Sequence, residues 1–218
     1  MQAIFETLFD VVYLITVVTL GFIMIKRSEG NKQYLLFGIM AVTLGFGDAF
    51  HLVPRAVALY TTGLDNYIAP LGIGKLITSI TMTIFYVLMY YAYRERYRVS
   101  GKSSLTIGVW ALAIARIILC LFPQNGWTSA DAPLAWGIYR NIPFTILGII
   151  IVVLYYRASR NDKAFRWMYL SIIISFACYI PVVLFADSIP IIGMLMIPKT
   201  CAYVWSVLIA FNAQRRNK

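Results

Sequence analysis

The chain has 218 residues, of which 61% are hydrophobic and only 13% are charged, and its formal net charge is +10 at pH 7. Soluble domains are usually about half apolar and about a quarter charged, so this composition excludes an ordinary soluble domain and predicts an integral membrane protein. The three cysteines lie within apolar runs, where we expect packed thiols rather than a disulfide framework. A single histidine leaves no zinc-binding pattern.

Seven stretches of the chain are long and apolar enough to cross a membrane, because a helical span needs about 20 mostly apolar residues. In chain order they cover residues 3–25, 34–54, 69–93, 104–122, 134–156, 165–186 and 189–212. We therefore predict an all-α membrane protein with a single seven-helix transmembrane domain over residues 1–218. Only a short turn separates the sixth and seventh stretches, so these two helices should be antiparallel neighbours.

Basic residues gather in the loops on one side of the predicted bundle. Fourteen of the 19 lysines and arginines lie in or beside the first, third and fifth loops and the C-terminal tail: Lys26, Arg27, Lys32, Arg94, Arg96, Arg98, Lys102, Arg157, Arg160, Lys163, Arg166, Arg215, Arg216 and Lys218. The loops of the other side, residues 61–71, 123–133 and 187–189, contain none. By the positive-inside rule the N-terminus is then outside the cell and the C-terminus is in the cytoplasm.

The same distribution accounts for the net charge by topology and by contact with anionic membrane lipids. We therefore expect membrane lipids as partners and no nucleic acid. The expected location is the plasma membrane, which in a bacterium is the inner membrane.

A three-plus-three repeat is a further interpretation of the chain. Aligning its two halves places Asp10 on Asn141 and Lys75 on Lys199, and each lysine then lies in the third helix of its triplet. Since the first and fifth helices both start outside, such repeats would run parallel rather than inverted. The two triplets and the helix that joins them would cover residues 3–93, 134–212 and 104–122.

The second predicted helix carries a polar row within an otherwise apolar run. Asp48, His51 and Arg55 stand at i, i+3 and i+7, a spacing that places all three on one helix face. Asp48 and His51 are candidates for an acid–base pair or a proton relay. The alternative is a histidine that a carboxylate orients for structural reasons. No G-x-S-x-G, H-E-x-x-H or glycine-rich phosphate loop accompanies the row, so we assign no catalytic residue and favour a protein that is not an enzyme.

Ionisable residues recur inside or at the edge of the other predicted spans. A charge at such depth costs about 3 kcal/mol or more, and these residues normally face the interior of the bundle or a wet cavity. The set consists of five bases and three acids: Arg55, Lys75, Arg116, Arg140, Lys199, Glu6, Asp10 and Asp48. Because the acids can neutralise only three of the bases, an excess of positive charge remains, which favours an anionic or zwitterionic ligand.

We predict from this set a polar chamber in the outer half of the bundle that binds, and transports, a small anionic or zwitterionic solute. The candidate ligand-binding residues are Asp10, Asp48, His51, Lys75, Arg116, Arg140, Asn141, Lys199 and Tyr203. The cations would hold the negative group, since arginine suits carboxylate or phosphate and lysine acts as a point charge. The acids and His51 would orient the solute or couple protons. We expect no metal and no cofactor.

Two alternatives stay open for the same residues. The charges could form structural pairs, such as Asp48 with Arg116 or Asp10 with Lys199, which knit helices together without a ligand. The chain could instead be an intramembrane enzyme acting on a lipid or prenyl-type substrate. Asp48 and His51 would then be its acid–base pair, and the cations would hold a phosphate or a developing oxyanion.

The predicted architecture resembles two kinds of seven-helix membrane protein. Parallel triplets with a linker helix are similar to the sugar and vitamin carriers of the three-plus-one-plus-three type, although Pro123-Gln124 stands in an outer loop rather than where those carriers place their PQ pair. Lys199 in the middle of the seventh span resembles the retinal-linking lysine of the microbial rhodopsins, which would imply a sensor that uses Lys199. The third helix here has no carboxylate to serve as counterion, which leaves Asp10 or Asp48 for that role. We assign the chain to neither family.

Overall fold

The computed structural model describes residues 2–186 and 188–216 of the chain. These residues form seven α-helices with three short 3₁₀ helices in the connections and no β-strand. The α-helices are α1 (Gln2–Lys26), α2 (Lys32–Tyr60), α3 (Ile68–Arg96), α4 (Ser103–Leu121), α5 (Leu134–Ser159), α6 (Met168–Phe185) and α7 (Met196–Arg216). The 3₁₀ helices are η1 (Leu64–Tyr67), η2 (Pro123–Asn125) and η3 (Pro190–Leu195). Seven segments of this described chain are long and apolar enough to cross a membrane, which confirms the prediction of an all-α multi-pass membrane protein.

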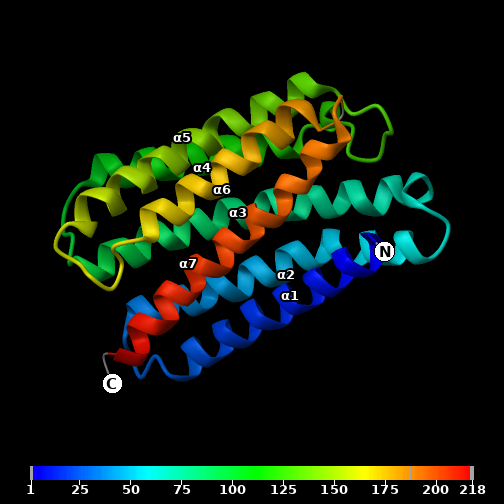
Figure 1. Ribbon diagram of the computed structural model, residues 1–218. Helices are drawn as coiled ribbons and strands as arrows, with labels where there is room; N and C mark the ends of the chain where they lie inside the picture. Colours follow the sequence, from blue (N-terminus) through cyan, green and yellow to red (C-terminus); the bar gives the residue numbers. More distant parts are fainter. Residues whose placement is uncertain (1, 187, 217–218) are drawn as a thin grey trace.

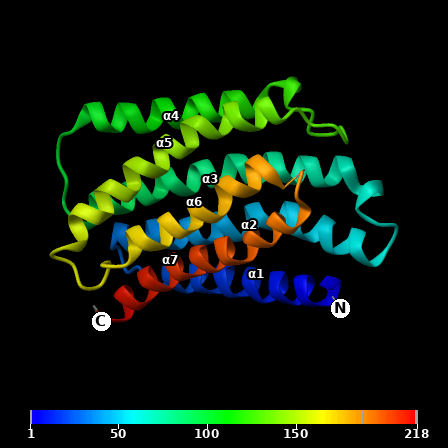
Figure 2. The same ribbon diagram turned by 45° about the horizontal axis from the view of Figure 1, so that its top comes forward.

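Successive helices run antiparallel along one elongated bundle (Figure 1). α2 packs against α1 and α3, α7 packs against α1 and α6, and α4 lies at the edge beside α3 and α5 (Figure 2). The end that holds the N-terminus and the connections after α2, α4 and α6 is called the N-terminal end below. The opposite end, which holds the basic loops, is called the basic end. Of the residues named in the predictions, Lys218 and Asp187 lie outside the described residues, and the membrane orientation and the repeat stay predictions.

Two helix boundaries differ from the predicted spans by more than five residues. α2 continues through Pro54 to Tyr60, although a proline inside a helix removes one backbone hydrogen bond. Membrane helices tolerate such prolines because neighbouring groups satisfy the backbone atoms that are freed. The last span was predicted to begin at residue 189, whereas α7 begins at Met196. The residues before it form η3, which has Pro190 in its first turn.

Glycines let α2 and α3 approach each other closely. A methyl group on Gly47 would collide with the side chain of Thr81, and one on Gly74 would collide with the backbone of Phe50. The hydroxyl of Thr78 donates a hydrogen bond to the carbonyl oxygen of Gly47 over 3.0 Å. Gly47 therefore serves the close packing of α2 on α3. This tight contact fixes the direction in which the polar row of α2 faces.

Aromatic side chains fill the interior of the bundle, and apolar side chains cover much of its outside. The buried rings include Phe37, Phe85, Tyr86, Tyr90, Phe144, Tyr155 and Phe165. On the outside, α1 alone exposes Ile4, Phe5, Leu8, Val12 and Ile15. Exposed apolar area of this extent is costly in water, but lipid tails are as apolar as leucine, so the surface suits a bundle surrounded by lipid.

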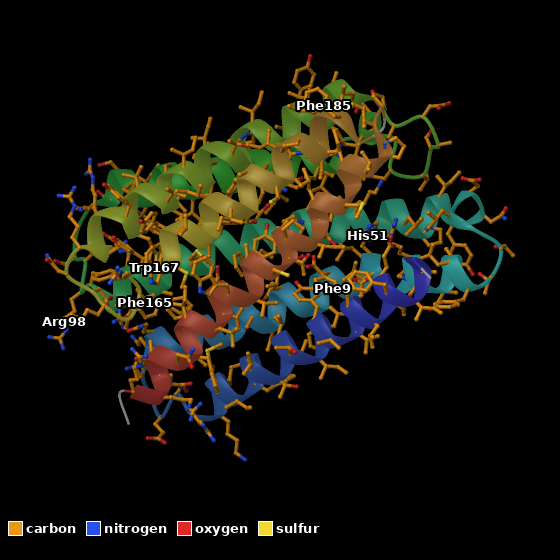
Figure 3. The ribbon with its side chains drawn as sticks, viewed as in Figure 1. Phe9, His51, Arg98, Phe165, Trp167 and Phe185 are labelled. Carbon is orange, nitrogen blue, oxygen red and sulfur yellow. The ribbon has the colours of Figure 1, made fainter. Side chains whose placement is uncertain are left out.

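A clamp of charged and aromatic side chains joins α3 to the α5–α6 loop at the basic end. Arg96 forms an ion pair with Asp162 through two N–H donors, the second over 2.9 Å, and the hydroxyl of Tyr97 donates to the same carboxylate over 2.7 Å. The Arg96 guanidinium also lies 4.1 Å from the ring centroid of Phe165. Burial raises the pKa of Asp162, but the hydrogen bonds from Arg96 and Tyr97 outweigh it and hold that pKa below its usual value. Figure 3 shows Phe165 at this end, far from His51 in the half nearer the N-terminus.

Candidate functional site

Asp48 is held where α1, α2 and α7 meet. Its Oδ2 atom accepts a hydrogen bond of 2.6 Å from the hydroxyl of Tyr13, a residue of α1 that is 3% exposed. From α7, the charge of Lys199 acts on the carboxylate, although no direct ion pair joins them within the described chain. A tyrosine hydroxyl and an ammonium group from two helices therefore converge on one carboxylate from a third.

Lys199 lies near the start of α7, among aromatic rings. It is 6% exposed, and its Nζ atom lies 5.1 Å from the ring centroid of Tyr179 and 5.3 Å from that of Tyr203. Both distances are within the range of a cation–π interaction. Of the two counterion candidates, Asp48 is the carboxylate whose charge acts on Lys199. A retinal link at Lys199 stays a prediction.

Arg116 is an almost fully buried guanidinium in α4. It is 2% exposed, and its Cζ atom lies 3.3 Å from the ring centroid of Phe144. The thiol of Cys120 interacts with the guanidinium, but its Nε and Nη1 atoms have no hydrogen-bond partner among the described residues. The charges of Arg116 and Lys199 act on each other, so the two cations belong to one region of the interior. Buried polar groups nearly always have a partner, and an arginine without one is costly.

Arg140 and Asn141 follow each other in α5 but face different neighbours. The side-chain oxygen of Asn141 accepts a hydrogen bond from Tyr179 of α6 over 2.9 Å, next to Lys199. Arg140 instead donates to Asn125 of η2 over 2.7 Å and lies over the ring of Trp127, 4.3 Å from its centroid. Asn141 therefore belongs to the interior, whereas Arg140 braces the α4–α5 connection.

A second group of charged side chains lies between α1, α2 and α3. Arg55 forms an ion pair with Glu6 over 3.0 Å, and the charges of both act on Asp10. The Nδ1 atom of His51 lies 3.2 Å from the carbonyl oxygen of Leu71, and since a carbonyl can only accept, this nitrogen is the donor. Lys75 is exposed, and its charge acts on His51.

The structure thus places the predicted site residues in two clusters, apart from Arg140, which lies in neither. The central cluster consists of Tyr13, Asp48, Arg116, Asn141, Tyr179, Lys199 and Tyr203. The peripheral cluster consists of Glu6, Asp10, His51, Arg55 and Lys75. Within the described residues, neither of the two structural pairs considered from sequence, Asp48 with Arg116 and Asp10 with Lys199, forms a direct ion pair. Asp48 and His51 also take different partners, so the polar row of α2 serves both clusters.

Several members of the site were not among the predicted residues. Tyr13 follows Asp10 by three positions, so the two share a helix face and the spacing carried a signal. Tyr179 lies within the apolar run of the sixth predicted span, where its hydroxyl is its one signal of a polar contact. Phe144, which stacks on Arg116, is one of many aromatic residues in apolar runs, and nothing in the sequence marks it.

Two apolar grooves open on the side of α7. The first, about 260 Å³, lies between α1 and α7 and is bordered by Tyr13, Cys201 and Trp205 among others. The second, about 390 Å³, lies between α6 and α7 and is bordered by Pro198, Cys201 and Trp205. Neither is lined by a charged side chain. In the part of the chain that the structure describes, no group of histidine, cysteine or carboxylate side chains has the arrangement of a metal site.

Comparison with known proteins adds no relative to this description. No family model, no curated protein and no solved structure matches the chain.

Proposed function

We propose that the central cluster binds a small anionic or zwitterionic solute and that the protein transports this solute across the membrane. One observation carries the proposal. Arg116 is only 2% exposed, yet two of its nitrogen atoms have no hydrogen-bond partner among the described residues. A buried charge without a partner is retained against a cost of several kcal/mol, and an anion would supply the missing acceptors.

The neighbours of Arg116 extend this site toward α7. Lys199 supplies a second cationic group, while Asp48, held by Tyr13, supplies the one carboxylate of the cluster. An amino group of a zwitterion would go to Asp48 and an acidic group to the cations. All of these residues lie in the half of the bundle nearer the N-terminal end, which the positive-inside rule places outside.

Ligand-dependent thermal stability tests the binding half of the proposal. The purified protein in detergent is screened against amino acids, carboxylates, phosphate and inorganic anions. We expect at least one member to raise the unfolding midpoint, since a ligand that binds only the folded state stabilises it. Lys199→Met should abolish the shift, and the matched control Lys163→Met, an exposed lysine of the α5–α6 loop, should keep it. A wild-type protein that no member stabilises, or an unchanged shift in Lys199→Met, would contradict the proposal.

Uptake into proteoliposomes tests the transport half. The solute found in the screen should accumulate in vesicles that contain the wild-type protein and not in vesicles that contain Lys199→Met. Binding without uptake would overturn transport while leaving the binding site in place.

The first groove favours a second candidate function. Its apolar wall includes Tyr13, whose hydroxyl contacts Asp48, so an alkyl or prenyl chain lying in it would end beside a carboxylate. An intramembrane enzyme acting on a lipid would use Asp48 in this way. Mass spectrometry of lipids after reconstitution is the test: a product that forms with the wild type and with Asp65→Asn, an exposed control, but not with Asp48→Asn would support the enzyme.

A further inference from the structure

We infer that the anion beside Arg116 is a small monovalent inorganic ion of halide size, bound without its water. This inference rests on the proposed function and names the ligand class of the same site. Three observations support it: the net charge of the central cluster, the N–H groups of Arg116 that have no acceptor among the described residues, and the close packing around the guanidinium.

The charge of the central cluster calls for one negative charge. The carboxylate of Asp48 and the ammonium group of Lys199 carry opposite charges that cancel. A guanidinium is always protonated in proteins, so Arg116 leaves an excess of one positive charge. A monovalent anion cancels this excess. A divalent anion reverses it, and a neutral zwitterion leaves it unchanged.

The hydrogen-bonding capacity of Arg116 fits a simple acceptor. Its unpartnered Nε and Nη1 atoms carry three of the five N–H donors of the guanidinium. A spherical anion accepts from such donors without a preferred direction. The guanidinium is also stacked on the face of Phe144, which in turn packs against Tyr86 and Phe176 with ring centroids 5.1 Å apart in each case.

The close packing around Arg116, which is 2% exposed and lies 3.3 Å from the ring centroid of Phe144, favours a small ion. The two grooves beside α7 are bordered by other residues. An ion needs little more room than one water molecule, about 30 Å³, which small side-chain movements between packed rings can provide.

The test is the anion dependence of thermal unfolding at constant ionic strength, with gluconate replaced stepwise by chloride or bromide. We expect the wild-type midpoint to rise saturably, by about 5 °C when the site is filled. Sulfate should give no comparable rise. Arg116→Met should lose the response. Arg157→Met, an exposed arginine of α5 at the basic end, should respond as the wild type does.

The outcomes separate this inference from the proposed function. If halides leave the wild type unchanged while an organic acid or amino acid stabilises it through Arg116, the halide inference falls and the proposed function stands. If Arg116→Met responds to chloride as the wild type does, the inference also falls. If neither halides nor organic solutes act through Arg116 or Lys199, both fall together.

Discussion

Tyr13 is the hydrogen-bond donor that holds the Asp48 carboxylate at the junction of three helices. Tyr13→Phe removes only the hydroxyl and should lower the free energy of unfolding by about 1.5–3 kcal/mol, because hydrogen bonds to charged groups are strong and the half-buried carboxylate loses its donor. Thermal or denaturant unfolding in detergent measures the loss. The matched control is Tyr139→Phe in α5, a tyrosine that is 52% exposed, where we expect a change within about 0.5 kcal/mol. Equal effects of the two substitutions would contradict the role given to Tyr13.

Single residues also show how far the sequence can predict the site. The sequence predicted Lys199 and Arg116 as site residues because both lie deep in an apolar span. A charge at that depth is costly and normally faces the interior of the bundle. The same argument could not separate Arg140 from Asn141. Successive residues of a helix point about 100° apart, and here the uncharged asparagine meets Tyr179 while Arg140 turns to Asn125.

Residue spacing predicted the shared face of the polar row of α2 but not the partners of its side chains. Spacing placed Asp48, His51 and Arg55 on one face, but each meets a different neighbour: Tyr13, the Leu71 carbonyl and Glu6. Periodicity gives the direction of a side chain relative to its own helix. The partner depends on how the neighbouring helix is rotated and shifted, which one sequence does not contain.

At the scale of elements, the clamp at the basic end makes stability depend on pH. The pKa of Asp162 is lowered in the folded state, so the carboxylate stabilises the fold fully above its unfolded pKa of about 3.9 and loses this effect as the pH falls through the folded value. Asp162→Asn should therefore be less stable than the wild type at pH 7, by about 2 kcal/mol, since it keeps the size of the side chain and loses the charge.

The pH profile distinguishes this electrostatic role from a packing role. Between pH 5 and about pH 3, the difference between wild type and Asp162→Asn should shrink, as measured by unfolding midpoints. Asp65→Asn, an exposed aspartate of η1, serves as the control and should follow the wild type throughout. A difference that stays constant with pH would mean that the charge of Asp162 contributes nothing.

The close contact between α2 and α3 gives a prediction of a different kind. Gly74→Ala places a methyl group against the backbone of Phe50, which cannot move aside as a flexible side chain can. We expect overpacking to cost about 1–3 kcal/mol in unfolding free energy. Gly108 of α4 has nothing within 4 Å of the added methyl, so Gly108→Ala should be neutral or slightly stabilising, since alanine favours helix. If both variants unfold at the same midpoint, the packing of α2 on α3 is looser than described.

Helix ends were the least predictable feature of the elements. α2 has 29 residues and is about 43 Å long, whereas the hydrocarbon core of a bilayer is about 30 Å thick. Hydropathy marks only the part of a helix that suits lipid, so the predicted second span ended at Pro54. Hydrogen bonding and packing against α1 and α3 carry the helix further.

At the scale of the whole molecule, the orientation in the membrane is the prediction to test first. Because the basic loops gather at one end, an alkaline phosphatase fused after Gly63 should be active, since that loop would face outward. A phosphatase fused after Gly101 should be inactive, and a green fluorescent protein at the C-terminus should fluoresce. The reverse pattern would place the central cluster in the cytoplasmic half and would overturn uptake from outside.

Hydropathy alone predicted the number of spans. A segment that crosses the lipid must satisfy its own backbone hydrogen bonds as a helix, and it needs a long run of apolar side chains. The arrangement of the helices did not follow. All seven predicted runs are apolar around most of their circumference, so no stripe in the sequence marks which helix is central. That α2 packs between α1 and α3 while α4 lies at the edge depends on small residues and buried rings, such as Gly47 and Phe144.

Cys201 borders both grooves of α7, one on each side of the helix, and its side chain is exposed. It follows Lys199 by only two residues, while Cys120 is buried. Cys201 is therefore a native labelling site close to Lys199 in α7. A lipid-soluble thiol reagent, or a spin label at this sulfur, would report on the occupancy of both grooves, without any cysteine being introduced.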